Sequence, residues 1–436
     1  MFKGALLFTL NMKSTKEILK FALPAVIENF LQMLMGLSDT FLVTRLGLAA
    51  VAGVSLANNI ITVYQAIFIA LGTILSSVLA RKMTRQMLNA GMKLTMLLGG
   101  FIGILTVIFA QDLVYFFGGR GEVAALGKTY LLLVGGTIVL LALMTSFGAI
   151  IRANGDTRTP MYASFFANLL NLLLSAILIF VLHMGVVGVA LGTMASRTLA
   201  LLYLWKKLKE KNLQPTKDFF KEKISKELIF LTLPAAGERL AMRVGDLVIM
   251  VLIIALGNPV FAGNAIGESI TQFNYMPAFG LATVTVILVA QEFGHKNIKA
   301  IRFYITRTYW LASSMMFAIG LFLVLGSSFL SRLFTSDTTA LAASHTVILF
   351  SFLATFFVTG TTTYTAAFQG IGNAKLPLYT TIIGMLVIRV GLGYVLSQIF
   401  AFGLEGIWFA VLADNFFRFV FLKLRFQRTI QHYLEI

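Results

Sequence analysis

The chain contains no cysteine and has few charged residues for its length. Without cysteine it has no disulfides, no thiolate metal sites and no cysteine nucleophile. Only 12% of the 436 residues are charged, whereas 58% are hydrophobic; soluble domains carry about 25% charged residues. Because lipid cannot satisfy backbone polar groups, this composition predicts an all-α integral membrane bundle.

Motifs for nucleotide, metal and nucleophilic chemistry are missing as well. The stretch 121–129 resembles a phosphate loop, but it has five residues between its glycines where the motif needs four, and no strand precedes it. The four histidines are scattered along the chain, and no two of them have the helical spacing of a pair of metal ligands. No Ser/His/Asp triad can be recognised either. These absences argue against an ATP-driven pump, a metalloenzyme and a triad hydrolase, so no catalytic residue is assigned.

Basic residues outnumber acidic ones by 35 to 18, which gives a net charge of +17. They stand at the ends of apolar spans, as the positive-inside rule describes, so the charge does not indicate a nucleic-acid partner. Apolar runs of membrane length predict twelve transmembrane helices. The spans lie near 17–43, 50–79, 92–117, 124–150, 160–182, 185–205, 227–256, 260–290, 303–330, 341–367, 377–400 and 403–426.

The loops between these spans alternate in basic content, which tests the count. One side is rich in lysine and arginine, whereas the other side holds only Arg45, Arg120, Lys128 and Arg332. Basic loops face the cytoplasm. Both chain termini are therefore predicted to be cytoplasmic.

The longest polar stretch falls in the middle of the chain and divides it. We expect a cytoplasmic N-terminus over 1–16, an N-terminal lobe over 17–205, a basic linker over 206–226, a C-terminal lobe over 227–426 and a cytoplasmic tail over 427–436. The linker is interpreted as a solvated connector that also contacts anionic headgroups. Met12 precedes a more ordinary cytoplasmic opening than Met1, so both are candidates for the start.

The two halves of the chain repeat each other. The matching stretches are Pro24 with Pro234 and Glu28 with Glu238 at a spacing of 210, 155–162 with 372–379 at 217, and 185–189 with 403–407 at 218. Equal helix numbers and matching cytoplasmic ends make these parallel repeats, related by an axis along the membrane normal. Secondary transporters are commonly built in this way, with the substrate path between the halves.

Two acidic residues, Glu28 and Asp39, interrupt the first apolar span. They share one helix face but lie roughly 16 Å apart along the axis, too far to hold one ion together. A carboxylate at this depth costs at least about 2.5 kcal/mol and usually has a function. Glu28 has a counterpart in Glu238, which fits a structural role common to both lobes. Asp39 corresponds to Ile249, and we predict that Asp39 binds a cation or a proton.

Several stretches resemble signatures of the multidrug and toxic compound extrusion (MATE) family. They are 29–43 with Leu46-Gly47 and 54–57 in the first two helices, the turn 152–160, Asn168–Asn171, and Gly188–Thr193. Their order and spacing extend the resemblance over essentially all twelve helices. The sequence of residues 32–39 and 58–70 is most similar to that of the DinF-like branch, which includes streptococcal Na⁺-coupled members.

The resemblance implies a bacterial cell-membrane antiporter that exports amphipathic organic cations in exchange for Na⁺ or H⁺. By position, Asp39 would be the anionic ligand and Asn171 an oxygen donor. Thr193 and the backbone of Val189 would contribute from the next helix. Many members carry aspartate where this chain has Ser175, which leaves open whether Na⁺ or a proton is preferred. Oxygen ligands of this kind suit Na⁺, a hard cation.

The C-terminal lobe carries further charged residues whose role the sequence leaves open. Arg243 lies three residues before Asp246 and five after Glu238, and an ion pair among them is the favoured interpretation. In the alternative, Glu238 or Asp246 attracts a cationic substrate. Glu268 in the next helix is open in the same way.

Two other functions compete with an antiporter. A lipid-linked oligosaccharide flippase of the same superfamily often has extra helices and a more cationic cavity, and the sequence shows neither clearly. An integral-membrane enzyme acting on lipid intermediates would need clustered catalytic groups at one membrane face. The expected partners are organic cationic drugs, Na⁺ or H⁺ and membrane lipid, with no nucleic acid and no organic cofactor, and the chain is expected to be a monomer.

Overall fold

The computed structural model describes residues 13–216, 219 and 221–435, except for the side chains of residues 36–40, 432, 434 and 435. Every regular element in these ranges is helical, which confirms the predicted all-α class. The chain divides into two compact units. Unit 1 comprises Met1–Val26 and Leu233–Ile436, and unit 2 comprises Ile27–Thr232.

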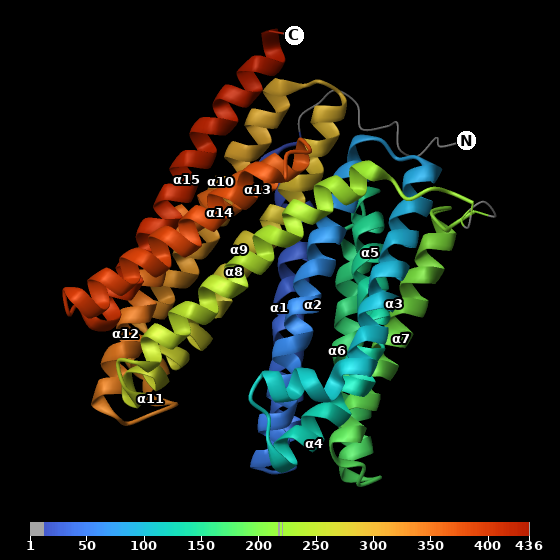
Figure 1. Ribbon diagram of the computed structural model, residues 1–436. Coiled ribbons are helices and arrows are strands. Elements are labelled where there is room, and N and C mark those ends of the chain that lie inside the picture. The colour runs from blue at the N-terminus through green and yellow to red at the C-terminus, as the bar shows by residue number, and fades with distance from the viewer. Residues whose placement is uncertain (1–12, 217–218, 220, 436) are drawn as a thin grey trace. The chain divides into compact units, whose positions relative to one another are not determined.

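Unit 2 is a helical bundle built from consecutive elements. They are the second part of α1 (Thr15–Thr44), α2 (Leu48–Arg81), α3 (Arg85–Phe116), α4 (Gly121–Tyr130), the π-helix η1 (Leu131–Gly135), α5 (Val139–Ala153), α6 (Arg158–Phe180), α7 (Gly185–Glu210) and the start of α8 (Lys226–Ile254). The long helices run alongside one another, and the short α4 lies at one end of them (Figure 1). The α4–η1 segment and α5 form a span bent by 42°.

Unit 1 contains the start of α1, most of α8, and all the elements that follow. These are α9 (Asn258–Gly294), α10 (Ile298–Leu325), α11 (Ser327–Arg332), α12 (Thr338–Leu353), α13 (Thr355–Gly370), α14 (Lys375–Ile382), the π-helices η2 (Ile383–Leu392) and η3 (Val395–Ile399), and α15 (Gly403–Glu435). Helix α9 packs against α10, α12 and α13. Helices α12 and α13 form a second bent span, with an angle of 55°.

Small residues let helices approach closely in both units. A Cβ atom added to Gly53 of α2 would lie 2.8 Å from the backbone nitrogen of Gly127 in α4. A Cβ added to Gly103 of α3 would lie 2.6 Å from the carbonyl oxygen of Gly136. In unit 1, a Cβ on Gly263 would overlap the carbonyl oxygen of Ala340. Such close packing holds helices together where lipid removes the hydrophobic driving force.

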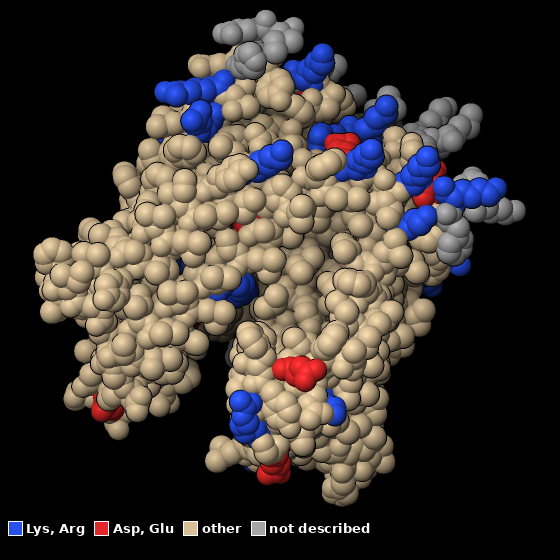
Figure 2. Space-filling model, in the orientation of Figure 1, with Lys and Arg blue, Asp and Glu red and all other residues tan. Residues whose placement is uncertain are grey.

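The helices are long and apolar enough to cross a membrane in most cases. Among the described residues, eight helices qualify by length and composition, and the two bent pairs raise the number to ten. Helices α8 and α15 have 29 and 33 residues, more than the roughly 20 that a span needs. They are not among these spans because the apolar part of each helix carries more than two charged residues. Figure 2 shows an otherwise largely uncharged face, with charged side chains mostly toward the helix ends.

The sequence repeat is visible in the local backbone. Three glycine pairs at the repeat spacings share a positive φ: Gly47 and Gly257 with 107° each, Gly155 and Gly372 with 89° and 80°, and Gly185 and Gly403 with 56° and 55°. Glycine adopts this region without the steric cost that a Cβ atom brings. Corresponding connections therefore turn in the same way in the two halves.

The described helices extend beyond several of the expected boundaries. Helix α7 continues to Glu210 and α15 to Glu435, so the predicted linker and tail both begin within helices. The first turns of α1 belong to unit 1 because Ile18, Ala22 and Ala25 pack into a core with α9 and α10. The expected N-terminal segment through Met12 lies outside the described residues.

Candidate functional site

Four of the predicted cation-site residues meet where α6 packs against α7. Asn171 and Ser175 come from α6, Val189 and Thr193 come from α7, and all four are 0% exposed. The Thr193 hydroxyl lies 3.0 Å from the Val189 carbonyl oxygen and 3.4 Å from Asn171 Oδ1. The Ser175 hydroxyl lies 3.1 Å from Asn171 Oδ1 and 3.5 Å from the same carbonyl. Four oxygens therefore converge in the interior of unit 2.

The local sequence explains this convergence. Asn171 and Ser175 are four residues apart, as are Val189 and Thr193, so each pair lies on one face of its helix. Gly192 lets the two helices meet, because a Cβ there would overlap the Ser175 hydroxyl and lie 2.8 Å from the Ser175 backbone nitrogen. Amide, carbonyl and hydroxyl oxygens are hard ligands for cations. The cluster is uncharged, so a cation site here needs a carboxylate from elsewhere.

The side chain of Asp39, the expected source of that carboxylate, is not among those that the structure describes. Its part in the site therefore stays a prediction. A described contact does tie α1 to the helix that carries Asn171. The Asn168 side chain of α6 donates a 2.5 Å hydrogen bond to the backbone carbonyl of Leu31 in α1. Asn168 lies three residues, or about one helical turn, before Asn171.

Glu28, the other acidic residue of α1, is held in a closed ion pair. Arg152 Nη1 of α5 lies 2.9 Å from each of the two Glu28 carboxylate oxygens. Both side chains are 11% exposed. The pair neutralises the carboxylate within unit 2, which favours a structural role for Glu28 over substrate binding.

The turn that follows Arg152 is organised by Asp156. Its Oδ1 accepts hydrogen bonds of 3.0 Å from the backbone nitrogens of Arg158 and Thr159 at the start of α6. Its Oδ2 accepts a 2.6 Å bond from the Thr159 hydroxyl and lies 3.1 Å from Lys211 Nζ. Partial burial opposes ionisation, but the bonds from Thr159 and the charge of Lys211 outweigh it and lower the pKa of Asp156.

Glu238 occupies the corresponding position in unit 1 but has a different partner. Gln369 of α13 donates a 3.2 Å hydrogen bond to Glu238 Oε2, and the glutamate is 5% exposed. Gln369 lies 217 residues after Arg152, a spacing of the repeat. Each half thus binds its repeated glutamate from the same helix position, through arginine in one half and glutamine in the other.

The acids of α8, for which an ion pair with Arg243 was predicted, have other contact partners in the structure. Glu238 is bound by Gln369, and Asp246 Oδ1 instead lies 3.3 Å from Arg389 Nη1 in η2. Five residues turn an α-helix by about 140° beyond one full turn, so Arg243 and Glu238 point in different directions. Arg243 is exposed on α8.

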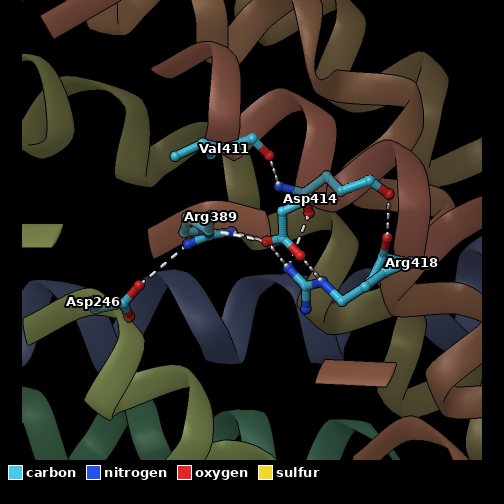
Figure 3. A network of polar contacts seen from close by, with 7 residues as sticks. Asp246, Arg389, Val411, Asp414 and Arg418 are labelled. Atoms are coloured by element: carbon cyan, nitrogen blue, oxygen red, sulfur yellow. Dashed lines mark hydrogen bonds and ion pairs between the residues drawn. The ribbon is translucent and has the colours of Figure 1, made fainter. Parts of the chain in front are cut away.

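Asp246 belongs to a charge network that the sequence analysis missed (Figure 3). Arg389 also contacts Asp414 of α15, with Nη2 and Nε at 2.8 and 2.9 Å from Oδ2. Arg418, one turn further along α15, places Nε and Nη2 each 2.8 Å from the Asp414 oxygens. The Asp414 side chain is fully buried, whereas that of Asp246 is 49% exposed. The rule that singled out Asp39, a charge inside an apolar span, applies equally to these residues.

Glu268 lies near this network, and its charge interacts with those of Asp246 and Arg389. It is exposed on α9, one turn beyond Asn264, whose Oδ1 accepts a 2.9 Å bond from Trp408 Nε1. Its role stays open between substrate binding and structure. Within the described ranges, no group of three or more His, Asp or Glu residues could hold a metal ion.

Known proteins resemble this chain over nearly its whole length. The MatE family matches residues 24–177 and 234–395. The probable multidrug resistance protein NorM of Thermotoga maritima is 31% identical over 425 residues, covering 94% of this chain and 91% of that protein. The multidrug export protein MepA of Staphylococcus saprophyticus is 25% identical over 424 residues, covering 92% and 91%. A crystal structure of MATE in the straight conformation shares the fold, with a TM-score of 0.88, 23% identity and coverage of 100% and 99%.

These matches agree with the architecture and with the resemblance inferred from the sequence. Both halves match the family, and its solved structures have twelve helices in two lobes. The assignment to the DinF-like branch stays a prediction. The relatives are transporters rather than enzymes, as expected. The chain belongs to the MATE family of multidrug transporters.

Proposed function

We propose that this transporter exports amphipathic organic cations from bacterial cells in exchange for Na⁺, with H⁺ as the alternative coupling ion. The ion would bind Asp39 together with the oxygen cluster of Asn171, Ser175, Val189 and Thr193. The observation that carries this proposal is the convergence of four buried oxygens between α6 and α7. The multidrug export proteins among the relatives support the substrate class.

The composition of the cluster favours Na⁺ over a proton. A proton needs only one basic group, whereas a desolvated Na⁺ needs several oxygens in place of its water. Two hydroxyls, one amide oxygen and one backbone carbonyl provide such ligands without adding charge. With Ser175 in place of a second carboxylate, Asp39 alone would balance the charge of one monovalent ion.

Coupling requires that the ion and the drug stabilise opposite conformations, since only differential affinity shifts an equilibrium. Helix α1 is a candidate for the moving element. Pro24 lies inside α1, where it removes one backbone hydrogen bond and favours a bend. It lies two residues before Val26, the last residue of α1 that belongs to unit 1. Neutralisation of Asp39 by Na⁺ would then change the preferred bend of α1 during alternating access.

Ethidium efflux from membrane vesicles, with Na⁺ and proton gradients imposed separately, tests the proposal. We expect the Na⁺ gradient to drive efflux and Asp39→Asn to abolish it. Thr193→Val removes one ligand without changing side-chain size, and we expect the Na⁺ concentration for half-maximal efflux to rise roughly tenfold. Thr95→Val is the matched control, because Thr95 is a buried threonine of unit 2 that bonds Ser146 instead.

Two results would contradict the proposal. Efflux driven by the proton gradient alone, at a rate independent of Na⁺, would show that the coupling ion is wrong. Normal efflux by Asp39→Asn would remove that carboxylate from the mechanism.

A further inference from the structure

The charge network of Asp246, Arg389, Asp414 and Arg418 in unit 1 corresponds, in the repeat, to the oxygen cluster of unit 2. The spacing of 218 places Arg389 at the position of Asn171 and Val411 at the position of Thr193. Asn171 and Thr193 join α6 to α7. Arg389 joins η2 to α15, the helix that carries Val411 (Figure 3). Equivalent helix pairs therefore carry both groups of residues.

The backbone supports this register. The repeat spacing grows from 217 at Tyr379 to 218 at Gly403, so one residue is inserted between them. The π-helix η2 (Ile383–Leu392) lies in this interval, and a π-turn accommodates one additional residue. The spacing of 218 already holds at Leu396. A Cβ added to Gly406 would lie 2.9 Å from the carbonyl carbon of Leu396. At the equivalent positions of unit 2, a Cβ added to Gly188 would lie 3.1 Å from the carbonyl carbon of Leu178.

The equivalent residues Asn171 and Arg389 have opposite roles toward a cation. Asn171 offers an oxygen to a cation, whereas Arg389 is itself a cation. Its guanidinium lies between the carboxylates of Asp246 and Asp414, with closest contacts of 3.3 and 2.8 Å. Asp246 corresponds at a spacing of 210 to Gly36, about one helical turn before Asp39. An acid of the first helix of the repeat and a positive charge from the fifth thus meet within unit 1.

We infer that Arg389 is a tethered cation that occupies, in unit 1, the site corresponding to the exchangeable-ion site proposed for unit 2. For that comparison the inference rests on the proposed function. The network contains two arginines and two aspartates, whose formal charges cancel. The neighbouring Arg243 and Glu268, whose charges interact with Asp246, add one charge of each sign, so the balance holds without an added ion. Unit 1 consequently takes up no coupling ion, and the asymmetry between the repeats restricts ion exchange to unit 2.

Removal of the guanidinium should open a cation site. Arg389→Gln leaves Asp246, Asp414 and Arg418 with one uncompensated negative charge. We expect purified, full-length Arg389→Gln to bind one more monovalent cation than the wild type. Radioactive Na⁺ binding at fixed pH and proton uptake in Na⁺-free buffer distinguish which cation enters. Arg389→Lys retains a tethered charge, and Arg389→Gln/Asp246→Asn restores neutrality, so both should match the wild type.

The same measurements separate this inference from the proposed function. A wild type that binds no Na⁺ contradicts the proposed coupling ion, whereas the difference between Arg389→Gln and the wild type still decides the inference. In an Asp39→Asn background, the additional cation of Arg389→Gln should persist. Equal cation uptake by Arg389→Gln and the wild type would overturn the tethered-cation assignment.

A folding defect of Arg389→Gln is also informative. Under the inference, Na⁺ or acid supplies the missing positive charge and restores the yield of monodisperse protein. If Arg389→Gln fails to fold at every Na⁺ concentration and pH while the neutral double variant folds, no free cation enters the site and the inference is wrong.

Discussion

Glu28 and Glu238 occupy equivalent positions of the repeat, and in each half a single partner side chain, Arg152 or Gln369, determines how the glutamate is bound. Both glutamates are buried and both are bound from the same position of a later helix. Arg152 provides a full positive charge and closes an ion pair, whereas Gln369 provides a neutral donor. A buried charge that loses its ionic partner is strongly destabilising. The partner residue therefore determines how much of the fold depends on each glutamate.

Arg152→Ala should lower the free energy of unfolding by about 3 kcal/mol, because Glu28 keeps a buried charge without its partner. Arg152→Gln should lose less, since an amide can donate to the carboxylate as Gln369 does to Glu238. Thermal unfolding of the purified protein in detergent measures both changes. Equal stability of Arg152→Ala and the wild type would show that the pair contributes nothing.

Gly192 is the residue on which the close approach of α6 and α7 depends. Gly192→Ala places a Cβ against the Ser175 hydroxyl and backbone, and we expect a loss of about 1–3 kcal/mol from overpacking. Ser175→Gly in the same chain should recover part of this loss, because it removes the side chain but not the crowded backbone. Gly100→Ala is the control, since a Cβ at Gly100 meets nothing within 4 Å. Thermal unfolding midpoints compare the four proteins, and no loss in Gly192→Ala would contradict the contact.

At the scale of elements, the ends of the helices are fixed by short local motifs. Asp156 caps the start of α6 and also binds Lys211 just beyond the end of α7. The positive-φ glycines Gly155 and Gly372 place equivalent turns after α5 and α13. Such turns hold α6 and η2, which carry Asn171 and Arg389, in corresponding positions along the two repeats.

The lowered pKa of Asp156 gives a pH dependence of defined sign. Because ionised Asp156 is favoured in the folded state, its contribution to stability is present above the ordinary aspartate pKa of about 4 and is lost as the pH falls through the lowered value. We expect Asp156→Asn to unfold at a lower temperature than the wild type at neutral pH. The difference should shrink below about pH 4.

Lys211→Gln is the companion variant, because it removes the ion pair and leaves the hydrogen bonds from Thr159. It should lose less stability than Asp156→Asn at neutral pH. A difference between Asp156→Asn and the wild type that stays constant from neutral to acid pH would show that the ionised carboxylate is not the stabilising group.

At the scale of the whole molecule, the distribution of charge sets the expected orientation in the membrane. The basic linker and its neighbouring loops are predicted to be cytoplasmic, and the loop near Glu122 is predicted to be external. The chain contains no cysteine, so single introduced cysteines report on one position each.

Lys221→Cys and Glu122→Cys test this orientation, because both parent residues are exposed. A membrane-impermeant thiol reagent should label Glu122→Cys in intact cells and Lys221→Cys only after permeabilisation. The cysteine-free parent gives the background signal. Labelling of Lys221→Cys in intact cells would reverse the predicted topology.

Composition and spacing along the chain were enough to predict the membrane class and the helical repeat, whereas four members of the candidate site were predicted from the family resemblance. The membrane class and the repeat depend on local patterns, namely long apolar runs and fixed repeat spacings, and the four-residue intervals of Asn171 with Ser175 and of Val189 with Thr193 are compatible with the site that the resemblance implies. Helical geometry places such residues on a common face, and the approach of α6 and α7 then brings the two pairs together.

The pairing of the charges in unit 1 is set by the tertiary structure. Asp246 and Arg389 are 143 residues apart, and their contact depends on the rotation of α8 and η2 about their own axes. Local sequence favoured Arg243 as the partner, but the π-helix directs Arg389 toward both Asp246 and Asp414. Ion pairing between helices follows from their packing, which no local interval in the chain encodes.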